Sequence, residues 1–96
     1  MMATYDQWLD AYSAAYDATP GPLVLACPNC GHARLNLVFT GDPDRMIGYA
    51  HFWCGYCLQG LGVSRTDIPA GATLQDSRLP RDERRPQVPD YQLVQP

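Results

Sequence analysis

The four cysteines constrain the fold of this chain more than any other feature of its sequence. They form two Cys-x-x-Cys pairs, "CPNC" at Cys27 and Cys30 and "CGYC" at Cys54 and Cys57, with residues 31–53 between the pairs. A Cys-x-x-Cys turn points two sulfurs at one ion, and zinc prefers four tetrahedral ligands, thiolates among them. The spacing therefore predicts one zinc ion per chain, held by all four cysteines.

The size of the chain indicates a structural role for this zinc. With 96 residues the protein forms one small domain, which buries only about 60–65% of its unfolded surface and gains stability from a metal. Four thiolates complete the coordination shell and leave no position for a reactive water. We therefore expect His32 and His51, one near each pair, to be surface or supporting residues rather than ligands. Iron in a rubredoxin-like electron-carrier site uses the same four ligands, and the sequence leaves that alternative open.

The segment around the cysteines predicts a hairpin and a third strand. Residues 35–40 alternate apolar and polar side chains, "TGDPDR" is typical of a turn, and residues 46–53 form the returning strand. Residues 58–66 are a third strand, weakened by two glycines. "CPNCG", the hairpin and "CGYC" together resemble a zinc ribbon over about residues 22–66. The resemblance implies a three-stranded antiparallel sheet on a structural zinc and is nearly silent about function.

The hairpin tip carries a second, narrower resemblance. The zinc ribbon of transcript-cleavage elongation factors presents an acidic pair to a metal in RNA polymerase, and "GDPDR" places Asp42 and Asp44 at the corresponding tip. The acids of that family are adjacent, whereas Pro43 separates these two. Gly, Asp and Pro are also the residues that ordinary turns require. We therefore predict that Asp42 and Asp44 are structural turn residues.

An amphipathic helix is predicted before the cysteines, over residues 5–18. Thr4 is a suitable N-cap and Gln7 completes a capping box, while Pro20 and Gly21 end the helix. Its apolar face consists of Tyr5, Trp8, Leu9, Tyr12 and Tyr16. Left exposed, this face would cause association. We expect it to pack on the ribbon sheet of its own chain or of a second copy.

The C-terminal third differs in character from residues 1–66. Residues 67–96 contain five prolines and the charged run "RDERR" at 81–85, with few large apolar groups. They are predicted to form an extended Pro-rich arm rather than a second domain. "YQLV" at 91–94 has more apolar character than a linker needs, and we predict that it adds a short strand to a sheet edge of its own chain or a partner's.

Charge and motifs narrow the function classes. The formal net charge is −3, which argues against a dominant grip on phosphates. The sequence contains no recognisable pairing of a nucleophile with a base and no phosphate-binding loop. We therefore expect a non-enzymatic accessory protein that binds a protein partner or a second copy of itself. The alternative is a nucleic-acid or RNA-polymerase-associated factor that uses exposed side chains of the ribbon. Its candidate contacts are Arg34, Arg45, Arg65, Phe39, Tyr49, Phe52 and Trp53.

The first 26 residues and the lengths of the apolar runs give an expectation of where the protein is located in the cell. Residues 1–18 have no basic stretch followed by an apolar run, as a signal peptide would have. The longest aliphatic run, "LVLA" at 23–26, is far too short to cross a bilayer. We expect a cytoplasmic protein with no membrane partner, in a compartment where paired cysteines bind metal rather than form disulfides.

Overall fold

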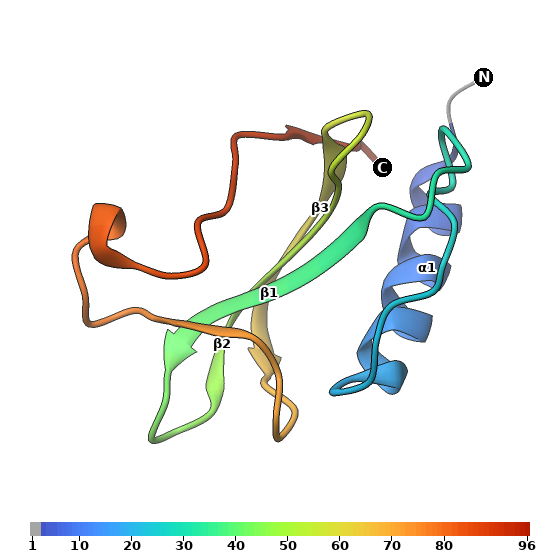
Figure 1. Cartoon of the computed structure of the whole chain (residues 1–96). Coiled ribbons are helices and arrows are strands. Elements are labelled where there is room, and N and C mark those ends of the chain that lie inside the picture. The colour runs from blue at the N-terminus through green and yellow to red at the C-terminus, as the bar shows by residue number, and fades with distance from the viewer. Residues whose placement is uncertain (1–2) are drawn as a thin grey trace.

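The structure is a computed structural model that describes residues 3–96, with one α-helix, a short 3-10 helix and a five-stranded mixed sheet (Figure 1). The strands lie in the order β4-β1-β2-β3-β5. The elements along the chain are α1 (Tyr5–Ala18), β1 (Leu35–Asp42), β2 (Ile47–Cys54), β3 (Gln59–Asp67), β4 (Leu74–Asp76), the short 3-10 helix η1 (Arg81–Glu83) and β5 (Gln92–Leu93).

Helix α1 begins and ends where the sequence predicts. The Gln7 amide donates to Thr4 Oγ1 at 3.2 Å, and the Thr4 amide donates to Gln7 Oε1 at 2.8 Å. These two bonds satisfy amide groups that have no partner within the first turn. The capping box and the predicted range 5–18 are confirmed.

Figure 1 shows α1 beside the sheet, and the aromatic face of the helix packs on the sheet of its own chain. The ring of Trp8 meets Phe52 edge-on with centroids 5.8 Å apart, and Tyr16 meets Phe39 in the same way at 6.2 Å. Trp8, Phe39 and Phe52 are fully buried. Edge-to-face pairs add to the free energy of area burial. The prediction that the helix covers the sheet is confirmed.

The three central strands form the predicted antiparallel unit. Strand β1 pairs with β2 from Leu35 opposite Cys54 to Asp42 opposite Ile47, and β2 pairs antiparallel with β3. Because side chains alternate along a strand, β2 divides its residues between two faces. Phe52 faces the helix, whereas His51 and Trp53 lie on the opposite, outer face, against the arm.

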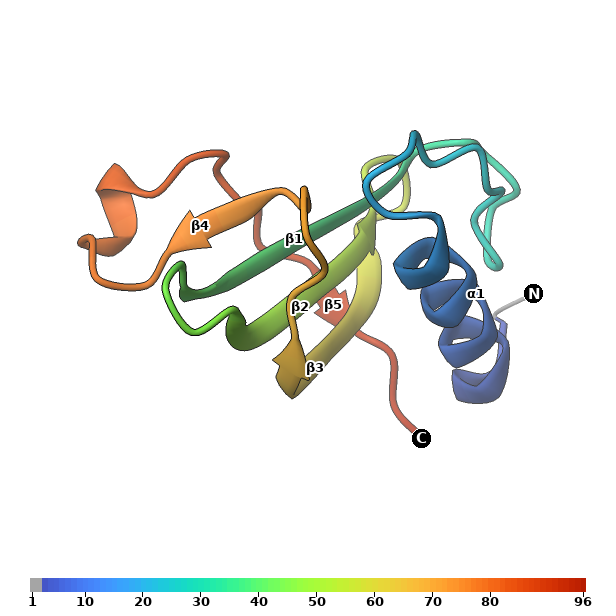
Figure 2. The ribbon, with the colours of Figure 1, turned by 90° about the horizontal axis from the view of Figure 1, so that it is seen from below.

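The expectation of a three-stranded, purely antiparallel sheet is wrong, because the C-terminal arm adds a strand at each edge (Figure 2). Strand β4 pairs parallel with β1, with Leu74 opposite Phe39, and β5 pairs parallel with β3, with Gln92 opposite Gln59. A three-stranded sheet leaves unpaired amide and carbonyl groups along both edges. Residues of the arm satisfy part of each row, and the prediction that "YQLV" adds an edge strand in its own chain is confirmed.

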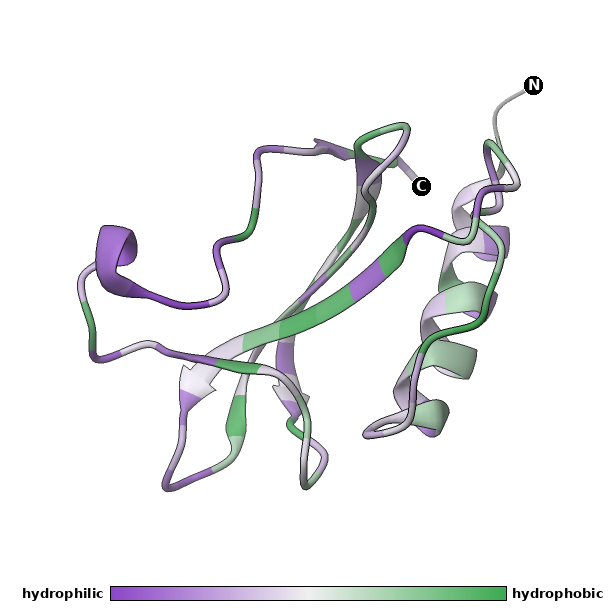
Figure 3. Cartoon of the chain, viewed as in Figure 1, coloured by the Kyte–Doolittle hydropathy of each residue, from purple (hydrophilic) through white to green (hydrophobic). Residues whose placement is uncertain are grey.

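Between its two strands the arm crosses the outer face of the sheet. The Tyr91 ring stacks on Trp53 with centroids 5.8 Å apart, and the Tyr91 hydroxyl donates to the Leu61 carbonyl at 3.0 Å. Trp53 is only 5% exposed as a result. Figure 3 shows that η1, in contrast, is hydrophilic along its length. The molecule thus has a helix on one face of the sheet and the arm on the other.

Among residues 3–96, no helix is both long enough and apolar enough to span a bilayer.

Candidate metal centre

The fold brings the four cysteines together at one end of the sheet. Cys27 and Cys30 lie in a turn before β1, Cys54 ends β2, and Cys57 lies in the turn between β2 and β3. Because Leu35 at the start of β1 pairs with Cys54, the second turn lies beside the first. All four sulfurs lie within 4.8 Å of one another, which is a group that could hold a metal ion.

The sulfur distances fit a tetrahedral ion. Cys27 Sγ is 3.7 Å from Cys57 Sγ, and Cys30 Sγ is 3.6 Å from Cys54 Sγ. A tetrahedral site with zinc–sulfur bonds of about 2.3 Å separates its sulfurs by about 3.8 Å. A disulfide would require about 2.05 Å, and the four cysteines are free. The cluster therefore has the geometry of a four-thiolate metal site.

The two cysteine turns have the same backbone hydrogen bonds. Two residues after the first cysteine of each pair, an amide donates to that cysteine's sulfur at 3.4 Å, from Asn29 to Cys27 and from Tyr56 to Cys54. Four residues after it, an amide donates to its carbonyl at 2.9 Å, from Gly31 to Cys27 and from Leu58 to Cys54. Amides that face thiolates stabilise their negative charge.

The fourth position after each first cysteine has a left-handed backbone, and here the two turns differ. Gly31 has φ 77° and Leu58 has φ 55°. The left-handed region is open to glycine but costs other residues about 1–2 kcal/mol. Gly55, which lies inside the second turn, does not have a positive φ. In the second turn the strained position is therefore occupied by a leucine.

Burial and hydrogen bonding shift the pKa values of Cys27, Cys54 and Cys57 in different directions. Burial raises the pKa of Cys27 to about 12 and also raises the pKa of Cys57. Burial acts in the same direction on Cys54, but amides of Cys57 and Tyr56 and the neighbouring thiols outweigh it, so the pKa of Cys54 is lowered. A bound cation would hold all four as thiolates, since coordination deprotonates a thiol outright.

Asn29 supports the centre, and the sequence analysis missed it. Its Oδ1 accepts from the Ala3 amide at 2.6 Å and from Trp8 Nε1 at 3.3 Å, while its Nδ2 donates to Gln59 Oε1 at 2.5 Å. One side chain of the first turn thereby joins the start of the helix to the start of β3. A polar residue inside Cys-x-x-Cys was the only signal for this role.

The two histidines lie outside the sulfur cluster, as expected. Within residues 3–96, the group of converging ligand atoms consists of the four thiols alone. The His32 ring stacks on Tyr56 with centroids 3.8 Å apart and an interplanar angle of 18°. His51 lies on the outer face of the sheet, where its Nε2 is 3.0 Å from Thr40 Oγ1. Neither ring completes the coordination of the cluster.

The acidic hairpin tip forms a local turn. The Asp44 amide donates to Asp42 Oδ1 at 2.8 Å, and the Met46 amide donates to the Asp42 carbonyl at 2.8 Å. The Asp44 carboxylate pairs with Arg78 at 3.3 Å. The bond from the Asp44 amide to the Asp42 carboxylate, two residues apart, is the usual role of aspartate in turns. The turn role predicted for Asp42 and Asp44 agrees with these contacts.

Most of the aromatic residues proposed for stacking on bases belong to the core. Phe39 and Phe52 are fully buried and Trp53 is 5% exposed, so only Tyr49 of the four is partly accessible. Base stacking requires an accessible ring face. The structure therefore leaves little of the aromatic surface that this alternative needs.

No known protein family, no curated protein and no solved structure matches this chain.

Proposed function

We propose that this chain is a small non-enzymatic accessory protein that holds one structural zinc ion and binds a protein partner beside it. Cys27, Cys30, Cys54 and Cys57 are the proposed ligands. The observation that carries the metal assignment is the convergence of four sulfurs within 4.8 Å at near-tetrahedral spacing. Four thiolates suit zinc and leave it no open position, so the ion supports the fold and performs no reaction.

The proposed partner site is a surface formed by His32, Tyr56 and Leu58, which we term the knuckle surface. Tyr56 is 61% exposed and Leu58 is 44% exposed, and the His32 ring lies flat on Tyr56. Leu58 occupies a left-handed position where glycine would be more stable. An exposed apolar side chain kept under backbone strain is a mark of function rather than of stability. This supports an apolar contact with a protein partner.

Elemental analysis of protein purified without added metal tests the ion. We expect one zinc per chain and no visible absorbance. Cys54→Ser should release the metal, since three thiolates and a hydroxyl bind zinc more weakly. Iron with visible absorbance would replace the proposal by an electron carrier, and the absence of any metal would contradict both.

Leu58→Gly tests the partner site without weakening the fold. It removes the exposed side chain while relieving the strained backbone. Tagged wild-type and variant proteins would be used to capture partners from the native host, with sedimentation of the purified protein to detect self-association. We expect the interaction to be lost in Leu58→Gly and retained in Ile47→Ser, which removes another exposed apolar residue, 51% exposed, from the hairpin. Equal capture by all three proteins would contradict the knuckle surface.

Titration with random DNA and RNA at several salt concentrations separates the alternative class. A phosphate-binding protein loses affinity steeply as salt rises. We expect no salt-dependent binding, because the net charge is −3 and three of the four candidate stacking rings, Phe39, Phe52 and Trp53, are buried. A steep slope would favour a nucleic-acid partner.

A further inference from the structure

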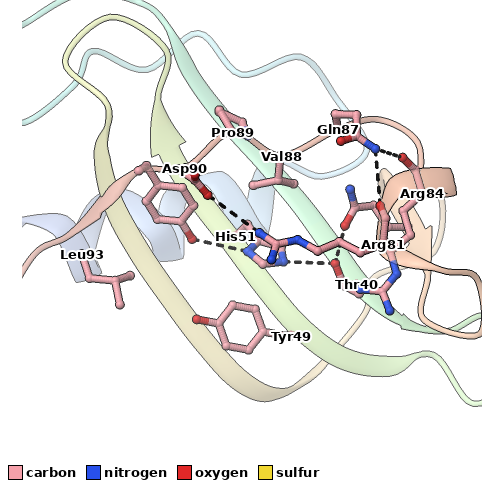
Figure 4. A pocket seen from close by; sticks show the side chains of 12 residues that line it. Thr40, Tyr49, His51, Arg81, Arg84, Gln87, Val88, Pro89, Asp90 and Leu93 are labelled. Atoms are coloured by element: carbon pink, nitrogen blue, oxygen red, sulfur yellow. Dashed lines mark hydrogen bonds and ion pairs between the residues drawn. The ribbon is translucent and has the colours of Figure 1, made fainter.

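A second candidate site lies on the outer face of the sheet, away from the thiols. There the arm arches over β1 and β2 and leaves an open pocket of about 450 Å3 (Figure 4). The volume is within the range of about 300–1,000 Å3 that is typical of small-molecule sites. The sheet contributes Thr40, Tyr49 and His51, and the arm contributes Arg81, Tyr91 and Leu93, among others.

Arg81 offers unused hydrogen-bond donors to this pocket. Figure 4 shows its side chain reaching from η1 across the sheet toward Asp90. The ion pair between the two is long, 3.8 Å, and both side chains are exposed. Within residues 3–96 the Arg81 guanidinium makes no hydrogen bond, whereas Arg78 donates twice to the carboxylate of Asp76. A guanidinium with free donors is suited to bind a carboxylate or phosphate in two-point contact.

The floor of the pocket contains a directed chain of hydrogen bonds that ends at His51. Gln75, which is buried, donates its Nε2 to the Pro86 carbonyl, so its Oε1 faces Thr40 as an acceptor. The Thr40 hydroxyl therefore donates to Gln75 at 2.6 Å, and it accepts from His51 Nε2 at 3.0 Å. The proton of a neutral His51 consequently lies on Nε2.

The other ring nitrogen of His51, Nδ1, has no hydrogen-bond donor within reach among residues 3–96 in this neutral form. Its neighbour is the Tyr91 hydroxyl at 3.4 Å, which donates its single proton to the Leu61 carbonyl at 3.0 Å. Tyr91 is therefore an acceptor toward His51, and a proton on Nδ1 would complete the chain. What opposes that proton is burial, together with the charges of Arg81 and Arg84, which lower the pKa of His51.

We propose that this pocket binds a small organic oxyanion, whose charged end pairs with Arg81 and whose flat apolar part rests on Tyr49. The Tyr49 ring lies tilted against His51, with centroids 4.7 Å apart, and Leu93 adds an exposed apolar side chain. An anion at Arg81 offsets the positive charge near His51, so binding is coupled to proton uptake at Nδ1. The charged and titratable groups facing His51 are Arg81, Arg84, Asp90, Tyr49 and Tyr91.

Benzoate is the first probe, since it stays a monoanion between pH 6 and 8. We expect its titration, followed by NMR at constant ionic strength, to shift signals of Tyr49, His51 and Tyr91. Benzamide, which has the same shape without the charge, should shift none of them. Phenyl phosphate and inorganic phosphate then compare the two kinds of oxyanion and test the apolar part. Inorganic phosphate binding as tightly as phenyl phosphate would overturn the role given to Tyr49.

Two substitutions are expected to act in opposite directions. Arg81→Gln should weaken benzoate binding about tenfold, the loss of one charged contact. Asp90→Asn removes the competing carboxylate and should strengthen binding about two- to fivefold. Arg45→Gln removes the same charge from the turn between β1 and β2, outside the pocket lining, and should change nothing. An Arg81→Gln affinity equal to that of Arg45→Gln would overturn the site.

The proton coupling has its own measurement. Benzoate should bind more tightly at pH 6 than at pH 8 and should raise the pKa of His51, read from its ring signals. His51→Gln should remove the pH dependence of the affinity and leave the binding at pH 8. Binding that does not vary with pH in the wild-type protein would overturn the role of His51, and the absence of any benzoate shift would overturn the whole proposal.

Discussion

Single residues outside the four cysteines shape the two turns that bring the sulfurs together. The second cysteine turn holds Leu58 in a left-handed conformation that leucine disfavours, and Asn29 joins the first turn to α1 and β3. Neither residue is a ligand. Both nevertheless lie in the turns that position the sulfurs. Substitutions at either residue should therefore change the free energy of unfolding before they change the amount of metal bound per chain.

Leu58→Gly is expected to raise the free energy of unfolding of the metal-bound protein by about 0.5–1 kcal/mol. Glycine relieves about 1–2 kcal/mol of left-handed strain and costs about 0.5–1 kcal/mol in unfolded-state entropy. Little burial is lost, because the side chain is 44% exposed. Urea unfolding measures the change. Leu58→Ala keeps the strained Cβ and should give no gain; equal stability of the two variants would contradict the strain.

Asn29→Ala is expected to lower the free energy of unfolding by about 2 kcal/mol. It removes three hydrogen bonds and leaves the indole N–H of Trp8, a fully buried residue, without its acceptor. Thermal or urea unfolding followed by tryptophan fluorescence measures the loss. Gln59→Ala removes only one of the three bonds and should cost about 1 kcal/mol. A smaller effect for Asn29→Ala than for Gln59→Ala would contradict the central place of Asn29.

At this scale the sequence predicted the cysteines but not their supports. Cys-x-x-Cys spacing is typical of metal sites, and it predicted directly that Cys27, Cys30, Cys54 and Cys57 form a group that could hold a metal ion. The bonds of Asn29 join residues that are far apart in the chain, and no local pattern encodes them. The left-handed angle at Leu58 contradicts the preference of leucine, so the residue type gives no signal for it.

Among the elements, the C-terminal arm contributes to both packing and polar contacts. Tyr91 stacks on Trp53 and bonds to the backbone of β3, while β5 pairs with the same strand. The arm therefore stabilises the outer face that the helix does not reach.

Tyr91→Ala is expected to lower the free energy of unfolding by about 1–3 kcal/mol and to expose Trp53. The loss combines an aromatic stack with one hydrogen bond. Urea unfolding and quenching of tryptophan fluorescence measure it. Tyr91→Phe keeps the stack and should lose about 1 kcal/mol or less. If Tyr91→Ala left both the stability and the quenching unchanged, the arm would not be docked in solution.

His51 on β2 is expected to make stability fall as the solution becomes acidic. Burial, Arg81 and Arg84 lower the pKa of His51 below its ordinary value of about 6.5. The unfolded chain then binds a proton that the folded chain resists, so stability is full above pH 6.5 and declines as the pH falls through the folded pKa. The difference in unfolding free energy between wild type and His51→Gln isolates this contribution. A difference that is constant from pH 8 to 5 would contradict it.

The elements near the cysteines were predictable because local patterns encode them. The capping box and the aromatic spacing located α1, and alternation with a Gly-Asp-Pro turn located β1 and β2. Strand β4 is three residues long and pairs parallel with β1. So short a strand has no periodicity to detect, and its pairing depends on the edge that β1 leaves free.

For the whole molecule, the cysteine cluster proposed to hold zinc and the hydrophobic core are one unit. Cys27 and Cys54 are buried in the same cluster as Trp8 and Phe52. The loss of the ion should therefore spread beyond the two cysteine turns.

Chelation is expected to abolish cooperative unfolding, although α1 should keep part of its helicity. Structural zinc contributes an apparent ~10–16 kcal/mol near neutral pH, which is comparable to or larger than the total stability of a small domain. Near-UV circular dichroism and amide NMR spectra, recorded with and without a chelator, measure the change. Acid should have the same effect, because protons compete with the metal for the thiolates. Unchanged spectra in metal-free protein would show that the core holds without the ion.

The crossing of the sheet by residues 77–91 also sets an order of events during synthesis. A nascent chain that has reached Asp67 already contains α1, both cysteine turns and the three antiparallel strands, whereas the pairing of β3 at its outer edge waits for residues 92–94. Until then the backbone groups of Leu58 and Gly60 that later bond to Gln92 and Val94 are open to other chains. Synthesis that stops within the arm would thus leave a chain that contains all four cysteines and an unpaired edge of β3, which can pair with other chains.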